Sequence, residues 1–132
     1  MAQKRALVLL RERAEMTKAI APALRSRGWQ VSVQELSEES VESLEPQAFD
    51  LIILEIVSAG SAGLALCETI RKRSKTPLLL ILSTATSGDA IQGFYRGADA
   101  YVVEPFDMRE LIVRAEALVR RAAGHLRQSA SG

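Results

Sequence analysis

The sequence predicts a single α/β domain in which parallel strands alternate with helices. Five short apolar runs are spaced along 132 residues, a length that suits one domain. Between the runs, apolar residues recur every three or four positions, which is the period of a helix. Strand–helix alternation repeated in this way favours parallel strands joined by right-handed crossovers, with helices on both faces of a doubly wound sheet.

The strands are expected where the apolar residues are continuous. Three of the runs are apolar at every position, which is typical of strands covered on both faces. The run at 29–33 instead alternates apolar and polar residues, so we expect it near the sheet edge with one wetter face. The expected strands are Ala6–Leu10, Trp29–Val33, Phe49–Val57, Leu78–Leu82 and Ala100–Val103.

Five helices are expected between and after the strands. Pro22 allows a kink or a late start in the first, and Gly28 follows its end. Ser37 is placed to cap the second, and Gly97 to end the fourth. Asp107 with Glu110 reads as a capping-box variant that opens the last helix. The expected helices lie around Met16–Leu24, Ser37–Leu44, Leu64–Arg73, Ala90–Tyr95 and Asp107–Ala122.

Composition excludes several classes of function. A net charge of +1 provides no general attraction to nucleic acid or to an anionic membrane. The single cysteine, Cys67, and the single histidine, His125, exclude a disulfide framework, a cysteine- or histidine-rich metal site and a Cys-His or Ser-His-Asp catalytic set. No apolar run approaches the roughly 20 residues of a membrane-spanning helix. We therefore expect a cytoplasmic domain that is not an enzyme and binds neither nucleic acid nor membrane.

Four stretches of the chain are similar to one known family. They are Asp50–Glu55, Gly60–Leu64, Gly97–Phe106 and Arg109–Leu111, and the Gly-Ala-Asp string followed by Tyr-Val-Val-x-Pro-Phe is the most specific of them. From about Lys4 to Arg121 the chain resembles the response-regulator receiver domain, the phosphoacceptor module of two-component signalling. The resemblance implies a flavodoxin-like five-stranded sheet of order 2-1-3-4-5 with its site at the carboxyl edge. We expect a receiver-like domain over residues 1–123 and a flexible tail or the start of a linker over 124–132.

The resemblance implies a phosphoryl-transfer site from which this sequence departs. The family uses two acids after the first strand for Mg²⁺, an Asp ending the third strand, a Ser or Thr after the fourth, and a Lys before Pro-Phe. It also has a fifth-strand aromatic that rotates on switching. The matching residues are Arg11 and Glu12 for the acid pair, Glu55 for the acceptor, Ser83 or Thr84 for the hydroxyl, Glu104 before Pro105 for the lysine, and Tyr101 for the aromatic. Two alternatives stay open: a one-residue slip gives Leu10 and Arg11 for the acid pair, and the spacing back from Gly97 also allows Leu82 at the hydroxyl position.

These replacements predict that phosphotransfer to the domain is absent or negligible. Phosphoryl transfer depends on cations that neutralise the moving group, and Glu104 reverses the charge at the lysine position. Arg11 puts a positive charge where a magnesium ligand belongs, so we expect no cofactor and lost or weak Mg²⁺ binding. Our preferred arrangement places Arg11 between Glu55 and either Glu12 or Glu104, as an ion pair in place of the metal. Two alternatives stay open: Glu55 still accepts phosphate, or it mimics the phosphorylated state.

The function that follows is that of a pseudo-receiver, which binds a protein partner without being phosphorylated. The alternative is the regulatory half of a longer DNA-binding regulator, with its output domain beyond Gly132. In the family, the face made by the fourth helix, fifth strand and fifth helix forms homodimers. The interface candidates here are Ile91, Phe94, Tyr95, Tyr101, Arg109, Arg114 and Arg120.

Overall fold

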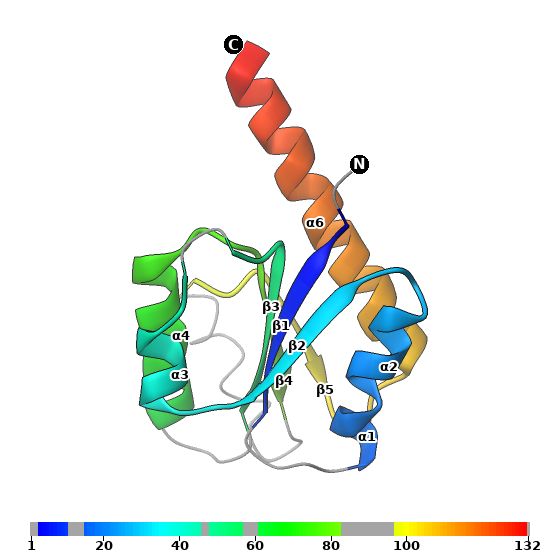
Figure 1. Ribbon diagram of the computed structural model, residues 1–132, viewed down its shortest axis with the longest axis vertical. Coiled ribbons are helices and arrows are strands. Elements are labelled where there is room, and N and C mark those ends of the chain that lie inside the picture. Colours follow the sequence, from blue (N-terminus) through cyan, green and yellow to red (C-terminus); the bar gives the residue numbers. More distant parts are fainter. Residues whose placement is uncertain (1–2, 11–14, 46–47, 57–60, 83–96, 132) are drawn as a thin grey trace.

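A five-stranded parallel sheet forms the centre of the molecule (Figure 1). The computed structural model describes residues 3–10, 15–45, 48–56, 61–82 and 97–131. The strand order is β2-β1-β3-β4-β5, and every neighbouring pair is parallel. The predicted fold class and strand order are therefore confirmed. The strands are β1 (Arg5–Leu10), β2 (Gln30–Glu35), β3 (Leu51–Ile56), β4 (Leu78–Leu82) and β5 (Ala100–Val103).

Helices follow four of the strands within the described residues. The first expected helix is divided at Ala19 into two short helices. Pro22 has no N–H to donate to the carbonyl of Lys18, which removes one helical hydrogen bond at the break. The helix expected around Ala90–Tyr95 lies outside the described residues. The helices are α1 (Glu15–Lys18), α2 (Ile20–Arg25), α3 (Glu38–Glu42), α4 (Ser61–Arg73) and α6 (Met108–Ser131).

Helix α6 extends beyond the end of the sheet (Figure 1). Its backbone stays helical through residues 124–131, within the segment 124–132 for which the sequence predicts a flexible tail or the start of a linker. At about 1.5 Å of rise per residue, its 24 residues span about 36 Å, whereas a six-residue strand such as β1 spans about 20 Å. The division of the chain at residue 123 stays a prediction.

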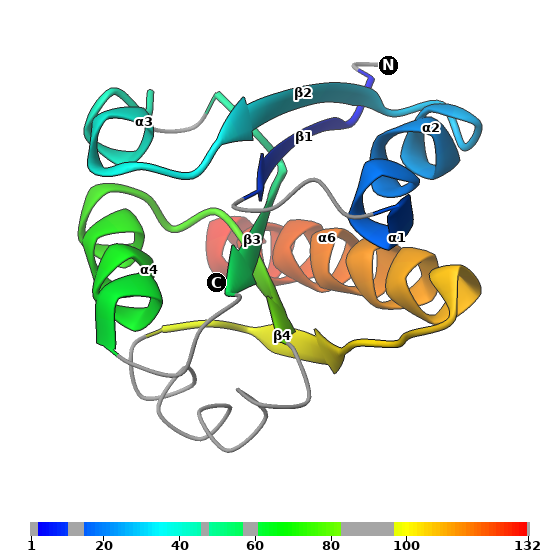
Figure 2. The same ribbon diagram turned by 90° about the horizontal axis from the view of Figure 1, so that it is seen from below.

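Two hydrophobic clusters, one on each face of the sheet, form the core. Helices α2 and α6 cover one face, and α3 and α4 cover the other (Figure 2). Alternation along β3 sends Ile53 into the first cluster and Leu54 into the second. In a strand that is packed on both faces, successive side chains are all buried, which explains the uninterrupted apolar runs. The edge strand β2 is the exception, because Val33 on it is 42% exposed.

Helix α3 begins at the residue that the sequence predicts. Ser37 has an extended backbone, and its Oγ accepts a hydrogen bond of 3.0 Å from the amide of Ser40. The Ser40 hydroxyl in turn accepts from the amide of Ser37 at 3.0 Å. This reciprocal pair is a capping box in which serine takes the place of the more usual Glu or Gln.

Candidate functional site

The candidate site lies where the strands end. Because the sheet is parallel, the carboxyl ends of β1, β3, β4 and β5 meet at one edge. Glu55 is the penultimate residue of β3 and is in register with Ile81 of β4, which in turn pairs with Val102 of β5. Glu104 follows β5 directly, and its amide donates a 2.7 Å hydrogen bond to the carbonyl of Leu82. The register thus carries Glu55 and Glu104 to the same edge.

Glu55 is buried in a strand that is otherwise entirely apolar. Only 2% of its surface is exposed, and it is the one charged residue in the buried part of the described chain. It stands two positions after Ile53, so strand alternation directs it to the face that α2 and α6 cover. A carboxylate is costly to bury, and nothing in the apolar pattern of β3 requires one at this position. Packing of the core therefore does not account for the carboxylate, and its position at the end of the strand marks it as a candidate site residue.

Glu104 and Pro105 form the start of the loop from β5 to α6. Glu104 is half-buried, Pro105 is exposed, and the peptide bond between them is cis. Phe106, the next residue, is buried in the cluster beneath α6. Glu104 therefore leaves the sheet between a backbone hydrogen bond to β4 and an aromatic anchor in the core.

Tyr101 lies on the other face of the sheet from Glu55. It is half-buried in β5 beside Leu80 and packs against the cluster on the α3 and α4 side, whereas Ala100 and Val102 point to the α6 side. Glu55, Tyr101 and Glu104 all make interactions, so none of the three is without a partner. The structure thus brings the two glutamates to one edge and leaves Tyr101 across the sheet from Glu55.

Several candidate residues lie outside the described part of the chain. The acid-pair positions Arg11 and Glu12 follow β1, and the hydroxyl positions Ser83 and Thr84 follow β4. The arrangement of Arg11 between glutamates is therefore still a hypothesis. Three of the interface candidates also lie outside the described residues: Ile91, Phe94 and Tyr95.

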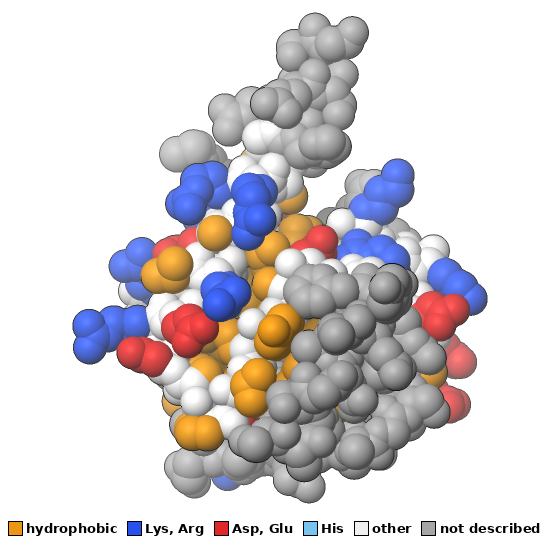
Figure 3. Space-filling view, turned by 180° about the vertical axis from the view of Figure 1, so that it is seen from behind, with side chains coloured by type: hydrophobic (Ala, Val, Ile, Leu, Met, Phe, Trp, Pro, Cys, Tyr) orange, Lys and Arg blue, Asp and Glu red, His pale blue; other side chains and the backbone are white. Residues whose placement is uncertain are grey.

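The three arginines predicted for an interface are exposed on α6, but they do not share one side of it. Arg109 lines a groove between α2 and α6. Arg114 pairs with Glu110 one turn earlier, at 3.2 Å, on the solvent side of the helix. Arg120 is eleven positions after Arg109, or about three turns, and so lies on the same side as Arg109. Seen from behind, charged side chains flank an apolar strip on the part of the surface that carries β5 and α6 (Figure 3).

The groove between α2 and α6 is a feature that sequence reasoning missed. It has a volume of about 360 Å³ and a largely apolar lining that includes Val113, which is 64% exposed. An ion pair of 2.9 Å between Arg27 and Glu116 joins its two walls. In the helical pattern of α6, Val113 falls in a stripe with the charged residues Arg109 and Glu116, and this apolar residue in a polar stripe was the available signal.

Two features that the described residues lack bear on other classes of site. Across the described residues, no group of three or more His, Cys, Asp or Glu side chains is gathered as a metal ion would require. The helices in the same part of the chain include none with the length and apolar character needed to cross a bilayer.

Comparison with known families gives a match over most of the chain. The profile of the response regulator receiver domain matches residues 9–116, which include both strand-end glutamates. The chain belongs to the response regulator receiver family. The receiver domain is 36% identical over 115 residues to the transcriptional activator protein PfeR of Pseudomonas aeruginosa, and 27% identical over 117 residues to the transcriptional regulatory protein ResD of Bacillus subtilis.

Those relatives are much longer than the receiver domain. The matched regions are 87% and 89% of this chain, but only 38% of PfeR and 49% of ResD. The chain therefore spans between about a third and a half of each of these two relatives.

Solved structures show the same fold. The receiver domain of TorR, the response regulator of the TMAO respiratory system, is 30% identical, with a TM-score of 0.73 over 89% of this chain and 98% of that one. NtrX of Brucella abortus superposes with a TM-score of 0.81 over 100% of this chain and 30% of its own, at 23% identity. At that identity, the likeness to NtrX concerns the fold.

Proposed function

We propose that this receiver domain is a pseudo-receiver that regulates a protein partner without accepting a phosphoryl group. The observation that supports the proposal is the placement of Glu55 and Glu104 at one sheet edge, at the positions that match the family's acceptor and its lysine. Both residues are acidic, whereas phosphoryl transfer requires cations around the moving group.

The length of Glu55 also opposes the reaction. Its carboxylate is one methylene, about 1.5 Å, further from the backbone than that of an Asp. Positioning errors of about 1 Å are enough to cost large factors in rate. Glu55 is also buried in the end of a central strand, so its backbone has little freedom to compensate.

The oxygen donors at this edge do not fit the magnesium ion that the family implies. Glu55 and Glu104 supply carboxylates, but of the two positions after β1 that match metal ligands only Glu12 is an acid, and the other is Arg11. A guanidinium supplies only N–H donors and a positive charge, whereas Mg²⁺ requires oxygen ligands in a near-octahedral arrangement. We assign no step to a metal, and we propose Arg11 as the local counter-charge for these glutamates.

The test is to expose the domain to acetyl phosphate with Mg²⁺ and to measure its intact mass. We expect no phosphoryl group on the natural chain. The matched variant carries Arg11→Asp, Glu55→Asp and Glu104→Lys together, and we expect it to gain one acid-stable, hydroxylamine-sensitive phosphoryl group at residue 55. A phosphoryl group on Glu55 of the natural chain would contradict the proposal and support the alternative that Glu55 is still an acceptor.

A mimic of the phosphorylated state is the remaining alternative for Glu55. It predicts that Glu55→Gln, which removes the charge and keeps the shape, changes the affinity for the partner. The change should be as large as the one that phosphorylation causes in a receiver that is switched by it. The pseudo-receiver proposal predicts the same partner affinity for both chains, measured by titration calorimetry once the partner is known.

We further propose that the partner is an output domain in the same polypeptide. The support is that PfeR and ResD, which are named as transcriptional regulators, are two to three times as long as the region they share with this chain. The test is to read the coding sequence after the codon for Gly132. A DNA-binding module there would support the proposal, and a stop codon would contradict it.

Self-association through the side of the molecule that carries β5 and α6 is proposed for the same module. The support is the apolar strip on that side, which has charged side chains of both signs around it (Figure 3). Arg114 of α6 is exposed and pairs with Glu110. Arg114→Glu should weaken a dimer in sedimentation experiments. Lys72→Glu, a charge reversal at an exposed residue of α4 that also belongs to an i,i+4 ion pair, is the control.

A further inference from the structure

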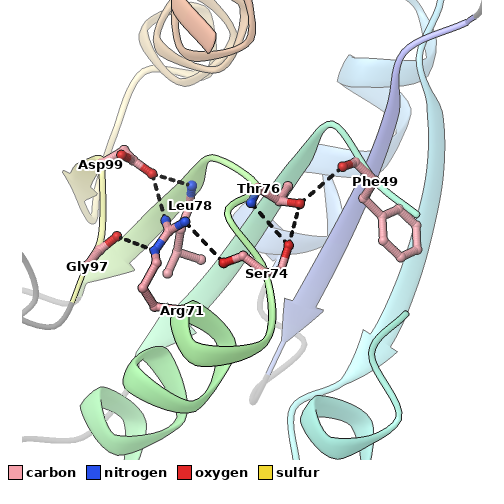
Figure 4. A network of polar contacts seen from close by, with 7 residues as sticks. All are labelled: Phe49, Arg71, Ser74, Thr76, Leu78, Gly97 and Asp99. Atoms are coloured by element: carbon pink, nitrogen blue, oxygen red, sulfur yellow. Dashed lines mark hydrogen bonds and ion pairs between the residues drawn. The ribbon is translucent and has the colours of Figure 1, made fainter. Parts of the chain in front are cut away.

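Arg71, in the last turn of α4, donates to three acceptors in two parts of the chain, the residues after α4 and the segment that leads into β5 (Figure 4). Its Nε donates to the carbonyl of Gly97 at 3.0 Å, and its Nη1 donates to the carbonyl of Ser74 at 3.3 Å. Its Nη2 lies 2.9 Å from Oδ2 of Asp99, which is 28 residues away along the chain. One planar guanidinium therefore joins the end of α4 to the segment that leads into β5.

Asp99 extends this connection to β4. The carboxylate oxygen that meets Arg71 also accepts a 2.9 Å hydrogen bond from the amide of Leu78, the first residue of β4. The Asp99 amide donates back to the carbonyl of Leu78, again at 2.9 Å. The first residue of β4 and the residue before β5 are thus held together from both sides.

Gly97 leaves room for the side chain of Arg71, because glycine has no Cβ. Its φ is +104°, and a Cβ added there would come within 2.6 Å of Cγ of Arg71. The aliphatic part of Arg71 therefore packs directly over a bare backbone, and its length is what brings the guanidinium to the carbonyl of Gly97 and on to Asp99.

We propose that Arg71 is a latch, a positioning residue that sets where the chain enters β5. The strand has four residues and, as an edge strand, pairs only with β4. Few contacts hold such a strand, so its local opening depends on how firmly its ends are held. The latch lies at the amino edge of the sheet, whereas Glu104 holds the carboxyl end through its amide. Through β5 the latch positions Tyr101, and the surface around it, relative to α4.

The experiment is amide hydrogen exchange on the full chain carrying Arg71→Met, which keeps an aliphatic side chain and removes all three donated bonds. Peptides over residues 97–103 should exchange at least about tenfold faster than in the natural chain, while those over 5–10 keep their rates. The control is Lys72→Met, which removes the neighbouring exposed pair with Glu68 and should change neither region.

Two results would overturn the latch. One is unchanged exchange over residues 97–103. The other is an equal increase in every strand, which indicates only a general loss of stability. Should Arg71→Met fail to fold, Asp99→Asn provides the second test, because the amide oxygen still accepts from Leu78 while the charge that attracts Arg71 is gone. It should accelerate exchange over the same segment and leave 5–10 unchanged; no such acceleration would contradict the proposal.

Discussion

Gly97 and Gly124 place the same residue type in opposite situations. Gly97 has a φ of +104°, a conformation that side chains with a Cβ rarely adopt, and Arg71 leaves no room for one. Gly124 lies inside α6 with nothing within 4 Å of where a Cβ would be. At Gly97 the backbone conformation requires glycine, whereas at Gly124 a helical position with open space around it does not.

The same substitution should accordingly have opposite signs at these two positions. Gly97→Ala should lower the free energy of unfolding by about 1–3 kcal/mol, because it combines backbone strain with displacement of Arg71. Gly124→Ala should raise it by up to about 1 kcal/mol, because alanine is the better helix former. Urea denaturation followed by circular dichroism measures both, and a stabilised Gly97→Ala variant would show that this conformation is not required.

Burial predicts a second contrast between residues. Ile53 is 0% exposed in the central strand β3, whereas Val33 on the edge strand β2 is 42% exposed. Ile53→Ala should cost about 2–5 kcal/mol of unfolding free energy, as expected for a cavity in a core that cannot collapse. Val33→Ala should change it by about 0.5 kcal/mol or less. Equal effects in thermal or urea denaturation would contradict the described packing.

Among the elements, α3 depends most visibly on its first residue. The helix has five residues, too few to be stable alone, and Ser37 provides its cap through the reciprocal bonds with Ser40. Its single buried residue is Val41. With so little packing, a local hydrogen bond at the start is a large share of what holds the element.

Ser37→Ala should therefore destabilise the protein by about 0.5–2 kcal/mol. Ser43→Ala, at the other end of the same helix, removes only an exposed hydroxyl that donates to the carbonyl of Ser40 and should have an effect of about 0.5 kcal/mol or less. Chemical denaturation of the two variants side by side provides the measurement. A Ser43→Ala variant as unstable as Ser37→Ala would mean that the capping box is not the main contribution.

At the scale of the whole molecule, the two ends of the sheet have different chemistry. The carboxyl edge carries buried Glu55 and half-buried Glu104 where the family has an acceptor and a lysine. The amino edge carries the Arg71 and Asp99 contacts that hold β4 and β5 together. If the latch holds β5 in place and the carboxyl edge accepts no phosphoryl group, as proposed, the surface around β5 does not change in response to a phosphoryl donor.

The association state of the receiver domain should then be insensitive to phosphoryl donors. We expect light scattering after size-exclusion chromatography to give the same molar mass with and without acetyl phosphate and Mg²⁺. The variant with Arg11→Asp, Glu55→Asp and Glu104→Lys is the comparison that can respond. A change of mass in the natural chain on adding the donor would indicate that the site still works as a switch.

The fold was predictable because its strands and helices are encoded by patterns between residues that are close in the sequence. Strands buried on both faces need uninterrupted apolar runs, so β1, β3 and β4 were readable from the residues alone, and the alternation of 29–33 predicted the edge strand β2. Ser37 was readable as a cap, because capping is settled within four residues. Glu55 and Glu104 were found by their similarity to a family pattern, and parallel pairing then carried both to one edge.

Contacts between distant residues could not be predicted in this way. In the sequence, Arg71 is only a cation at the end of a helix, and its bond to Asp99 exists because the fold brings together positions 28 residues apart. The groove closed by Arg27 and Glu116 joins positions 89 apart. That Arg109 lines this groove, whereas Arg114 does not, depends on where α2 packs against α6. The sequence by itself determined the elements, their order and the acidic character of the strand ends, because periodicity and residue chemistry are local. Only the tertiary structure decided which charges meet and which surfaces stay open, because those depend on how the helices pack against the sheet.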